Sequence, residues 1–402
     1  MKQSTVLLGL LLTALTGCNG EKPEPGGGKS AQPSGASGAV DQAGKKVDSA
    51  VKKATDDRAA LSPEEYEKLL LGLAKCSLKE SAIDPNCPER KAWVEGRTRA
   101  NALKDIGGLS GSLGKKHIKH ESPAVRIQAA ELLQSLFGTD KSGQAALLDA
   151  AKTEKEPAVL VAFVGTLQNE GKRNPDVGKF LLQMADHEAP MVRKRAMQAL
   201  SSGWNRDMDG AVDKLIEKID KDPDMSVREA ACESSGSHGD DKLVAVYDRY
   251  TADPKKEPKL YAACMKGLIE AWEDFPLYET ANEKAYKLTL KRLAYTPRSE
   301  TVPPWIAIGD FGYLGKTDSR SLTEWKKKAT WFKPAELQKL LEAVVEDPKA
   351  NWMARKAALD SMVGLGTDKA TLTRMKAKYK DAKEFGDKSL VEALDKAMAT
   401  AK

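Results

Sequence analysis

The sequence predicts an all-α protein, an α-solenoid of stacked helical hairpins, and three observations lead to this expectation. First, residues 121–138 read ESPAVRIQAAELLQSLFG, with Ser and Pro where a helix begins, apolar residues at helical spacing and Gly where it ends. Second, related stretches recur along the chain at a nearly constant interval. Third, a composition of 41% hydrophobic, 30% charged and 6% aromatic residues suits helices rich in Ala, Leu, Lys and Glu.

The repeats have a period close to 34 residues. Arg126, Leu160, Arg193, Arg228 and Tyr261 occupy equivalent positions, and subtracting their numbers gives spacings of 34, 33, 35 and 33 residues. Each unit contains a helix opened by an acidic or small residue, usually with Pro, then a turn and a second helix. No helix can bury its apolar stripe alone, so neighbouring units must stack into a solenoid.

The period alone would also fit tetratricopeptide or ankyrin repeats, but their diagnostic residues are missing from this chain. The recurring pattern Pro-x-Val-Arg-x-x-Ala-x-x-x-Leu, fullest at residues 123–133 and 190–200, resembles HEAT repeats of the short bacterial type. The resemblance covers about two thirds of the chain. It implies a right-handed solenoid that acts as a binding scaffold.

Residues 1–17 have the features of a lipoprotein signal peptide. Lys2 precedes an apolar run at residues 6–15, which is too short to cross a bilayer core of about 30 Å. Leu-Thr-Gly-Cys at residues 15–18 resembles the lipobox of bacterial lipoproteins. This resemblance implies cleavage before Cys18 and lipidation of this residue, so that the mature protein starts with an acylated cysteine that anchors it to a membrane. The alternatives are a cleaved signal of a soluble protein or a buried N-terminal helix.

Residues 18–60 are expected to form the lipidated Cys18 and a flexible tether, because Gly, Pro, Ser and Lys dominate them and little apolar surface is available. Asn19 follows the cysteine and favours the outer membrane, on its periplasmic face or surface, over the inner membrane. Residues 61–120 are expected to be an N-terminal helical cap that begins with the capping box of Ser62 and Glu65.

Two cysteine pairs are candidate disulfides. Cys76 and Cys87 flank a loop, and in an exported protein such a pair is expected to be oxidised, although two free thiols are the alternative. Cys232 and Cys264 occupy similar places in neighbouring repeats. Stacked helices lie about 8–10 Å apart, so this second bond is possible only if both thiols face the seam. Otherwise they are two small buried apolar side chains.

A glycine-rich run at residues 107–116 follows a helix expected over residues 89–106. Leu109 and Lys116 stand where a phosphate-binding Walker loop needs Gly and Ser or Thr, so a flexible loop between helices is expected instead. Five basic side chains gather nearby: Lys115, Lys116, His117, Lys119 and His120. Their His-x-x-His spacing lacks a zincin Glu, so a solvated basic surface is expected and no metal site.

Regular HEAT-like repeats are expected over residues 121–295, and an aromatic insertion interrupts them at residues 296–332. The insertion is rich in proline, which breaks helices. Six aromatic residues there are candidate partner contacts: Trp305, Phe311, Tyr313, Trp325, Trp331 and Phe332. The favoured alternative is that they fill the irregular junction between repeats. Residues 333–402 are expected to return to a HEAT-like repeat and a capping helix.

The sequence favours a non-enzymatic role. None of the hydrolase, zincin, dinucleotide-binding or calcium-loop motifs is present, and no cofactor is expected. The leading hypothesis is a membrane-anchored scaffold or adaptor for another protein of the bacterial cell envelope. The alternative is binding of an anionic envelope polymer or glycan through residues 115–119 or 326–328, and a lyase activity is least favoured. The net charge of +6, about +5 without Lys2, is a mild excess that does not indicate nucleic acid.

Overall fold

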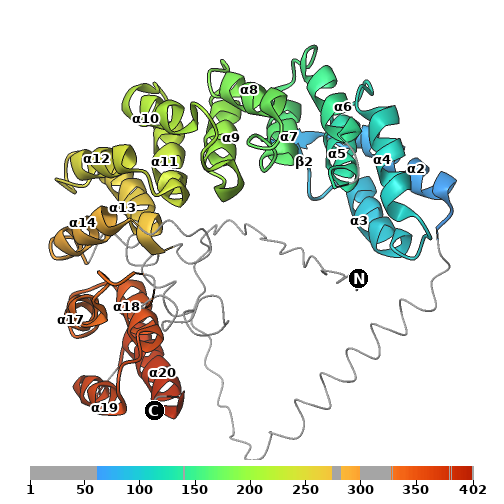
Figure 1. The fold of residues 1–402 in the computed structure, drawn as a ribbon. Helices are drawn as coiled ribbons and strands as arrows, with labels where there is room; N and C mark the ends of the chain where they lie inside the picture. The colour runs from blue at the N-terminus through green and yellow to red at the C-terminus, as the bar shows by residue number, and fades with distance from the viewer. Residues whose placement is uncertain are drawn as a thin grey trace, which may run out of the picture. The chain divides into compact units, whose positions relative to one another are not determined.

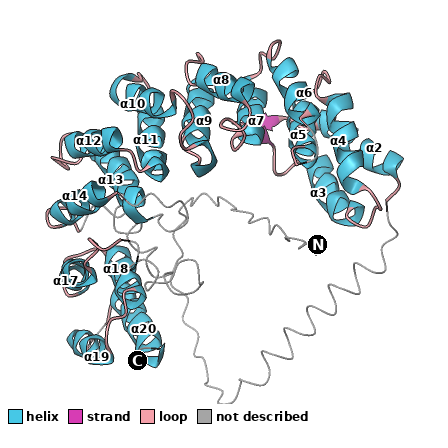
Figure 2. Cartoon of the chain, in the orientation of Figure 1, coloured by secondary structure: helices cyan, strands magenta, loops and turns pink. Residues whose placement is uncertain are grey.

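The computed structural model describes residues 61–138, 141–273, 282–298, 327, 329–379, 381 and 383–400. The chain divides into two units, residues 1–59 and 60–402, and all described residues belong to the second. The expected signal peptide, Cys18 and the tether therefore lie outside the described residues. The described chain is helical apart from one short hairpin (Figure 2), which confirms the all-α solenoid fold.

Five helical hairpins form the regular part of the stack (Figure 1). Their first helices are α5 (Pro123–Leu133), α7 (Pro157–Leu167), α9 (Pro190–Leu200), α11 (Met225–Ser234) and α13 (Pro258–Glu273). Their second helices are α6 (Ser142–Ala151), α8 (Pro175–Met184), α10 (Ala211–Lys221), α12 (Asp241–Tyr250) and α14 (Glu283–Leu293). Three short 3-10 turns extend first helices: η2 (Gln134–Leu136), η3 (Gly203–Asn205) and η4 (Ser235–His238).

The hairpins stack in two layers. In the first-helix layer α5 packs on α7, α7 on α9, α9 on α11 and α11 on α13. In the second-helix layer α6 packs on α8, α10 on α12 and α12 on α14. The first helices carry the larger share of the core: Val125, Val159, Val192 and Val227 are fully buried at equivalent positions. Each such side chain stabilises the fold by about 1.5–3 kcal/mol.

The helix starts follow from the residues that precede them. Pro occupies the first turn of α5, α7, α8 and α9, where its missing N–H costs no hydrogen bond. Two helices without Pro in their first turn have a side-chain cap instead: Asp224 accepts from the Ser226 N–H before α11, and Asn282 from the Ala285 N–H before α14.

Arginines of the repeat motif join each unit to the next. The Arg126 Nε lies 2.7 Å from Glu154 Oε2, and Arg228 Nη1 lies 2.9 Å from Glu257 Oε1. Arg355, near the start of helix α18 (Trp352–Gly364), makes the same kind of pair with Asp387. Where the motif lacks Arg, the contact changes. Leu160 is buried among apolar residues, and Tyr261 hydrogen-bonds Thr296 instead.

The N-terminal cap contains α2 (Pro63–Gly72), η1 (Leu73–Lys75), β1 (Leu78–Lys79), β2 (Ala82–Ile83), α3 (Pro88–Ala100) and α4 (Ile106–His117). Ser62 and Glu65 form the expected reciprocal capping box. The two strands pair as an antiparallel hairpin in the segment enclosed by Cys76 and Cys87, where the sequence indicated only a loop. Helix α3 ends at Ala100, six residues before the expected end at residue 106.

The glycine-rich run at residues 107–116 is helical, so the expected flexible loop is wrong. Glycine disfavours a helix, but here it allows close packing against α5. A Cβ at Gly111 would lie 2.4 Å from Leu136, and one at Gly114 would lie 2.9 Å from the Ala129 carbonyl oxygen. Tertiary packing with α5 thus outweighs the low helix propensity of these residues.

The seam between α11 and α13 is unusually close. A Cβ on Gly267 would lie 2.1 Å from the Cys232 carbonyl oxygen, and one on Gly236 would lie 2.4 Å from the Gly267 carbonyl oxygen. This approach brings Cys232 and Cys264 to a Cα separation of 4.8 Å, within the range of a disulfide. Both cysteines are fully buried in this seam.

The C-terminal part contains α17 (Pro334–Val345), α18 (Trp352–Gly364), α19 (Lys369–Lys378) and α20 (Phe385–Thr400). Helix α17 packs on α14 and α18, and α18 and α19 pack on α20. Residues 333–402 are thus mainly helical where they are described, and their assignment to a HEAT-like repeat and a capping helix stays a prediction. Within the described part of the chain, no helix combines the length and apolar character needed to span a membrane.

Candidate functional site

A polar groove on the first-helix layer is the candidate binding site. It has a volume of about 370 Å³ and crosses α9, α11 and α13. The charged and amide side chains that line it are Lys194, Gln198, Glu229, Glu233, Lys266 and Glu270. Because these residues come from three successive repeats, no single motif in the sequence reveals the groove.

The groove carries both signs of charge, with carboxylates in excess. Lys266 Nζ lies 2.5 Å from Glu233 Oε1 and 3.7 Å from Glu270 Oε1. These groups are partly exposed, so such pairs contribute little to stability and can exchange for groups on a partner. The arrangement suits recognition of a charged protein segment.

An exposed tryptophan in the 3-10 turn η3, after α9, was missed by the sequence analysis. Trp204 is 56% exposed, and the Arg173 guanidinium lies 4.8 Å from its ring centre. Trp and Arg are the residue types most often found at interaction hot spots. The only sequence signal for it is a tryptophan within the polar stretch SSGWNRD, where an apolar core position is not expected.

The predicted aromatic contact residues fall into two groups. Trp305, Phe311, Tyr313 and Trp325 lie outside the described residues. Phe332 is only 5% exposed, and its ring centre lies 5.3 Å from that of Tyr286 and 6.0 Å from that of Trp272. The Trp331 ring also packs on Tyr286, at 5.2 Å. Phe332 is therefore better explained by the alternative, in which the aromatic rings fill the junction between α13, α14 and α17.

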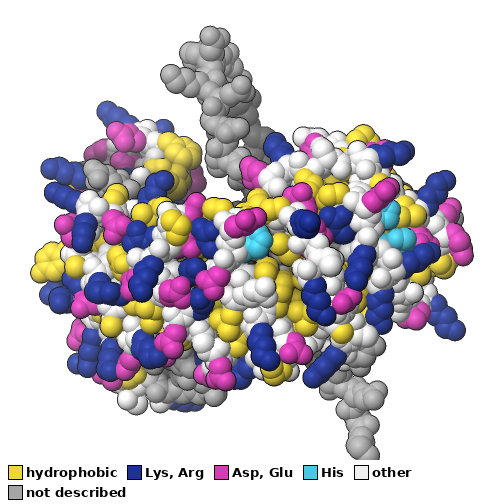
Figure 3. Space-filling model, turned by 90° about the horizontal axis from the view of Figure 1, so that it is seen from above, with side chains coloured by type: hydrophobic (Ala, Val, Ile, Leu, Met, Phe, Trp, Pro, Cys, Tyr) yellow, Lys and Arg dark blue, Asp and Glu magenta, His cyan; other side chains and the backbone are white. Residues whose placement is uncertain are grey.

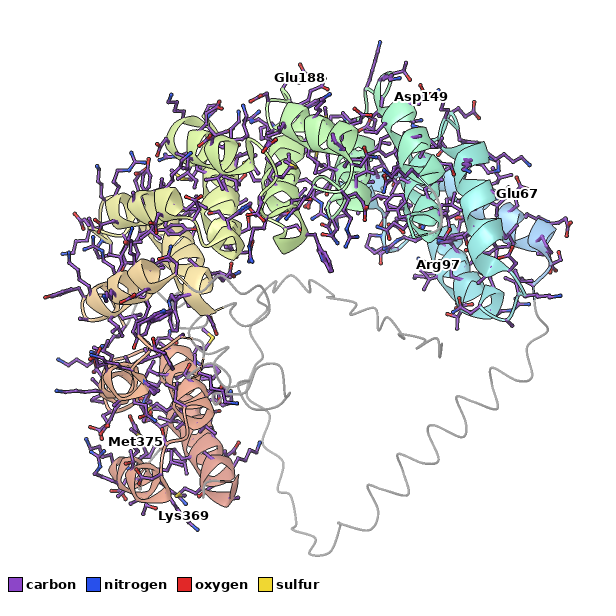
Figure 4. All side chains as sticks on the ribbon, in the orientation of Figure 1. Glu67, Arg97, Asp149, Glu188, Lys369 and Met375 are labelled. Atoms are coloured by element: carbon purple, nitrogen blue, oxygen red, sulfur yellow. A yellow bond between two sulfur atoms is a disulfide. The ribbon has the colours of Figure 1, made fainter. Side chains whose placement is uncertain are left out.

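The basic cluster at residues 115–120 is largely neutralised by acidic side chains. Lys116 Nζ and His117 Nε2 lie 2.7 and 2.5 Å from Glu67 Oε1, and Lys119 Nζ lies 2.6 Å from Asp149 Oδ2. Figure 4 labels Glu67 on α2 and Asp149 on α6. Hydrogen bonds from the basic groups lower the pKa of both carboxyls. This pairing weakens the case for an anionic polymer bound here.

The charge on one face of the molecule is mixed in the same way. Figure 3 shows Lys and Arg side chains interspersed with Asp and Glu, with no large area of one sign. Of the predicted lysines at residues 326–328, only Lys327 is described. A surface of alternating charge does not favour a uniformly anionic ligand.

The histidines of the basic cluster do not converge as metal ligands. The His117 and His120 rings lie 6.1 Å apart, and His120 Nδ1 accepts a hydrogen bond from the Ser122 N–H. The potential ligand group found among the described residues is Cys76, Cys87 and Glu89. Its two sulfurs are bonded to each other at 1.95 Å, which leaves no thiolate for a metal.

Both predicted cysteine pairs lie at disulfide distance. Cys76 and Cys87 have a Cα separation of 5.7 Å, and Cys232 and Cys264 are joined at an S–S distance of 1.90 Å. The second pair meets the condition that both side chains face the α11–α13 seam.

Comparison with known families agrees with this geometry. Residues 112–201 and 178–263 match the HEAT repeat family, which confirms the resemblance over these repeats. The matched segments include the first helices α5, α7, α9 and α11 and reach into α13, so they cover most of the groove. No curated protein matches the chain. The repeats are those of a helical scaffold for protein interactions, a class that is typically non-enzymatic.

Proposed function

We propose that this protein is a lipid-anchored scaffold or adaptor that binds another protein of the bacterial cell envelope through its first-helix layer. Acylated Cys18 would hold it to the outer membrane, on the periplasmic face or the surface. The lipobox-like residues 15–18 support the anchor. Two cysteine pairs at disulfide distance also suit an oxidising compartment outside the cytoplasm.

The observation that carries the proposal is the groove across α9, α11 and α13. Three repeats contribute side chains of both charges to one continuous surface. A protein segment presents Lys or Arg together with Asp or Glu and can therefore exchange ion pairs with this surface. Exchange of this kind favours specificity and association rate more than raw affinity.

The first test is a cross-linking pull-down of the lipidated protein from its native membrane fraction, washed at low and high salt. We expect a protein partner recovered in stoichiometric amount. Recovery of only glycan or lipopolysaccharide, eluted by salt, would replace the adaptor with the polymer-binding alternative.

The groove itself is tested by charge reversal. Glu229→Lys should reduce recovery of the captured partner, because Glu229 lines the groove on α11. Glu188→Lys makes the same change of charge at an exposed residue in the loop before α9, outside the groove, and should leave recovery unchanged (Figure 4). Equal recovery with both variants would move the interface away from the groove.

The anchor is tested separately with Cys18→Ala. We expect the wild-type protein to incorporate labelled palmitate and to partition into detergent, and the variant to do neither. A variant that still partitions with the detergent phase would rule out Cys18 as the point of attachment.

A further inference from the structure

Arg195 on α9 differs from the motif arginines because no acidic side chain among the described residues pairs with it. Its Nη2 donates to Gln168 Oε1 at 2.8 Å and its Nη1 donates to Gln198 Oε1 at 3.1 Å. Among the residues that the structure describes, no carboxylate forms an ion pair with Arg195. Arg193, two residues earlier on the same helix, is held by both oxygens of Asp222.

The guanidinium of Arg195 is held in place and only partly exposed. It lies against Gly165 of α7, where a Cβ would come within 2.8 Å of Nη2 and 3.0 Å of Nε. Burial lowers the pKa of Arg195, and among the described residues no carboxylate acts in the other direction. The positive charge is therefore partly desolvated without compensation, which makes it a favourable site for an external carboxylate.

The position of Arg195 connects it to the groove. Gln198, which accepts its hydrogen bond, is also a wall residue of the groove. A ligand bound to the guanidinium would therefore be separated from the groove only by Gln198. Glu229, Glu233 and Glu270 line the same groove as Gln198. Those carboxylates repel a ligand whose charges are all negative, but they attract a basic group beside the ligand's carboxylate.

We propose that Arg195 binds an Asp or Glu side chain of a partner protein, in a segment whose neighbouring Lys or Arg contacts the acidic side chains of the groove. A guanidinium can bind a carboxylate through two parallel N–H donors, which fixes its orientation as well as its position. This inference rests on the proposed scaffold function and specifies the chemistry of the partner.

The test uses a library of random twelve-residue peptides displayed on phage, selected against the full-length protein in detergent micelles. We expect the enriched peptides to contain both an acidic and a basic residue. Synthetic copies should bind Arg195→Gln about 10- to 100-fold more weakly than wild type, which corresponds to loss of a hydrogen bond to a charged group. Arg195→Lys should show an intermediate loss, because it keeps the charge but not the paired donors.

Arg249→Gln is the matched control. Arg249 lies on α12 in the second-helix layer, is 57% exposed and pairs with Asp220, so its loss removes the same charge away from the groove. This variant should bind the selected peptides as wild type does. The melting temperature of Arg195→Gln should equal or exceed that of wild type, because the substitution removes an uncompensated, partly buried charge.

Several outcomes would overturn the inference: no enriched peptide, enriched peptides without acidic residues, or equal affinity for wild type and Arg195→Gln. Enrichment of purely acidic peptides would instead indicate a site for polyanions. A melting temperature several degrees lower for Arg195→Gln would show that Arg195 stabilises the fold instead of serving as a binding residue. If the envelope partner is captured equally by wild type and Arg195→Gln, the scaffold function stands and the role of Arg195 fails.

Discussion

Arg193 and Asp222 form a buried, two-pronged ion pair between neighbouring repeats. Arg193 Nε lies 2.8 Å from Asp222 Oδ2 and Arg193 Nη2 lies 2.9 Å from Asp222 Oδ1. The guanidinium also donates to the His187 and Glu188 carbonyl oxygens, and Asp222 Oδ1 accepts from the Asp224 N–H. One carboxylate therefore joins the start of α9 to the turn that begins α11.

Removing one member of this pair should destabilise the fold strongly. Arg193→Gln removes the two-pronged partner of buried Asp222 and leaves only Lys218 Nζ, 3.8 Å from Asp222 Oδ2, so we expect the free energy of unfolding to fall by about 3–5 kcal/mol. Urea denaturation followed by circular dichroism measures this. Arg249→Gln, which breaks an exposed pair, should change it by at most about 1 kcal/mol. Similar losses for the two variants would show that burial does not set the strength of the pair.

The disulfide between Cys232 and Cys264 should stabilise the protein more than the one between Cys76 and Cys87. It closes a loop of 32 residues rather than 11. The lost conformational entropy of the unfolded chain stabilises the fold by about 4 kcal/mol for the longer loop and about 3 kcal/mol for the shorter. Thermal melting of the two paired Cys→Ala variants provides the comparison. The prediction fails if loss of the N-terminal pair lowers the melting temperature more.

Gly267 should tolerate no side chain. In Gly267→Ala the new Cβ would lie 2.1 Å from the Cys232 carbonyl oxygen, so α11 and α13 would have to separate. We expect a loss of about 1–3 kcal/mol, measured by urea denaturation, and slower formation of the Cys232–Cys264 bond on refolding.

Gly107→Ala is the matched control for Gly267→Ala. A Cβ at Gly107 meets no atom within 4 Å, and the residue lies within α4, so the change should stabilise the protein by up to about 1 kcal/mol through helix propensity. If both variants are equally stable, the close seam does not depend on glycine.

His238 should make stability depend on pH in a window just below neutrality. Burial lowers its pKa below the ordinary value of 6.5, and its Nε2 hydrogen-bonds the Leu200 carbonyl oxygen at 3.0 Å. When pH falls through 6.5 the unfolded chain binds a proton that the folded chain does not. Stability is therefore complete above 6.5 and decreases by up to about 1.4 kcal/mol per pH unit below it, until the folded pKa is reached.

Melting temperatures at pH 7.5 and 5.5 measure this effect in wild type and His238→Gln. We expect a larger decrease in wild type, because the variant cannot titrate there. Carboxylates whose pKa is lowered, such as Asp186, lose their stabilising charge only at lower pH, so their contribution is separate. An equal decrease in both proteins would assign the dependence to another group.

The sequence predicted the repeat fold because its information is local. Pro190 in the first turn of α9 and the capping box of Ser62 and Glu65 act within a few residues, and both appear where expected. The prediction of a flexible loop at the glycine-rich residues 107–116 was wrong because the effect of these glycines is not local. Gly111 and Gly114 favour α4 only once α5 lies against them, which helix propensity alone does not reveal.

The candidate site was harder to predict than the fold. Its groove is lined by Lys194, Glu229 and Lys266, which come from repeats about 35 residues apart. In the sequence, each of them has the pattern of an ordinary charged residue on a helix surface. The proposed role of Arg195 was also hidden, because it depends on the lack of an ion-paired carboxylate among the described residues rather than on any motif. Aromatic clustering identified residues 296–332, yet Phe332 there packs in the core. Aromatic composition does not distinguish a core from an interface.

The seams of the first-helix layer differ in mechanical stiffness. Between α11 and α13 a covalent bond and direct backbone contact prevent sliding, so this seam should transmit a load almost unchanged. In α7, Leu160 replaces the motif arginine and leaves only apolar contact at the equivalent position. The seam between α7 and α9 is held by packing and by hydrogen bonds such as that from Arg195 to Gln168, so it should yield to a pulling force before the covalently bonded seam does. In the scaffold function proposed above, tension would therefore act on the proposed Arg195 contact before it separates α11 from α13.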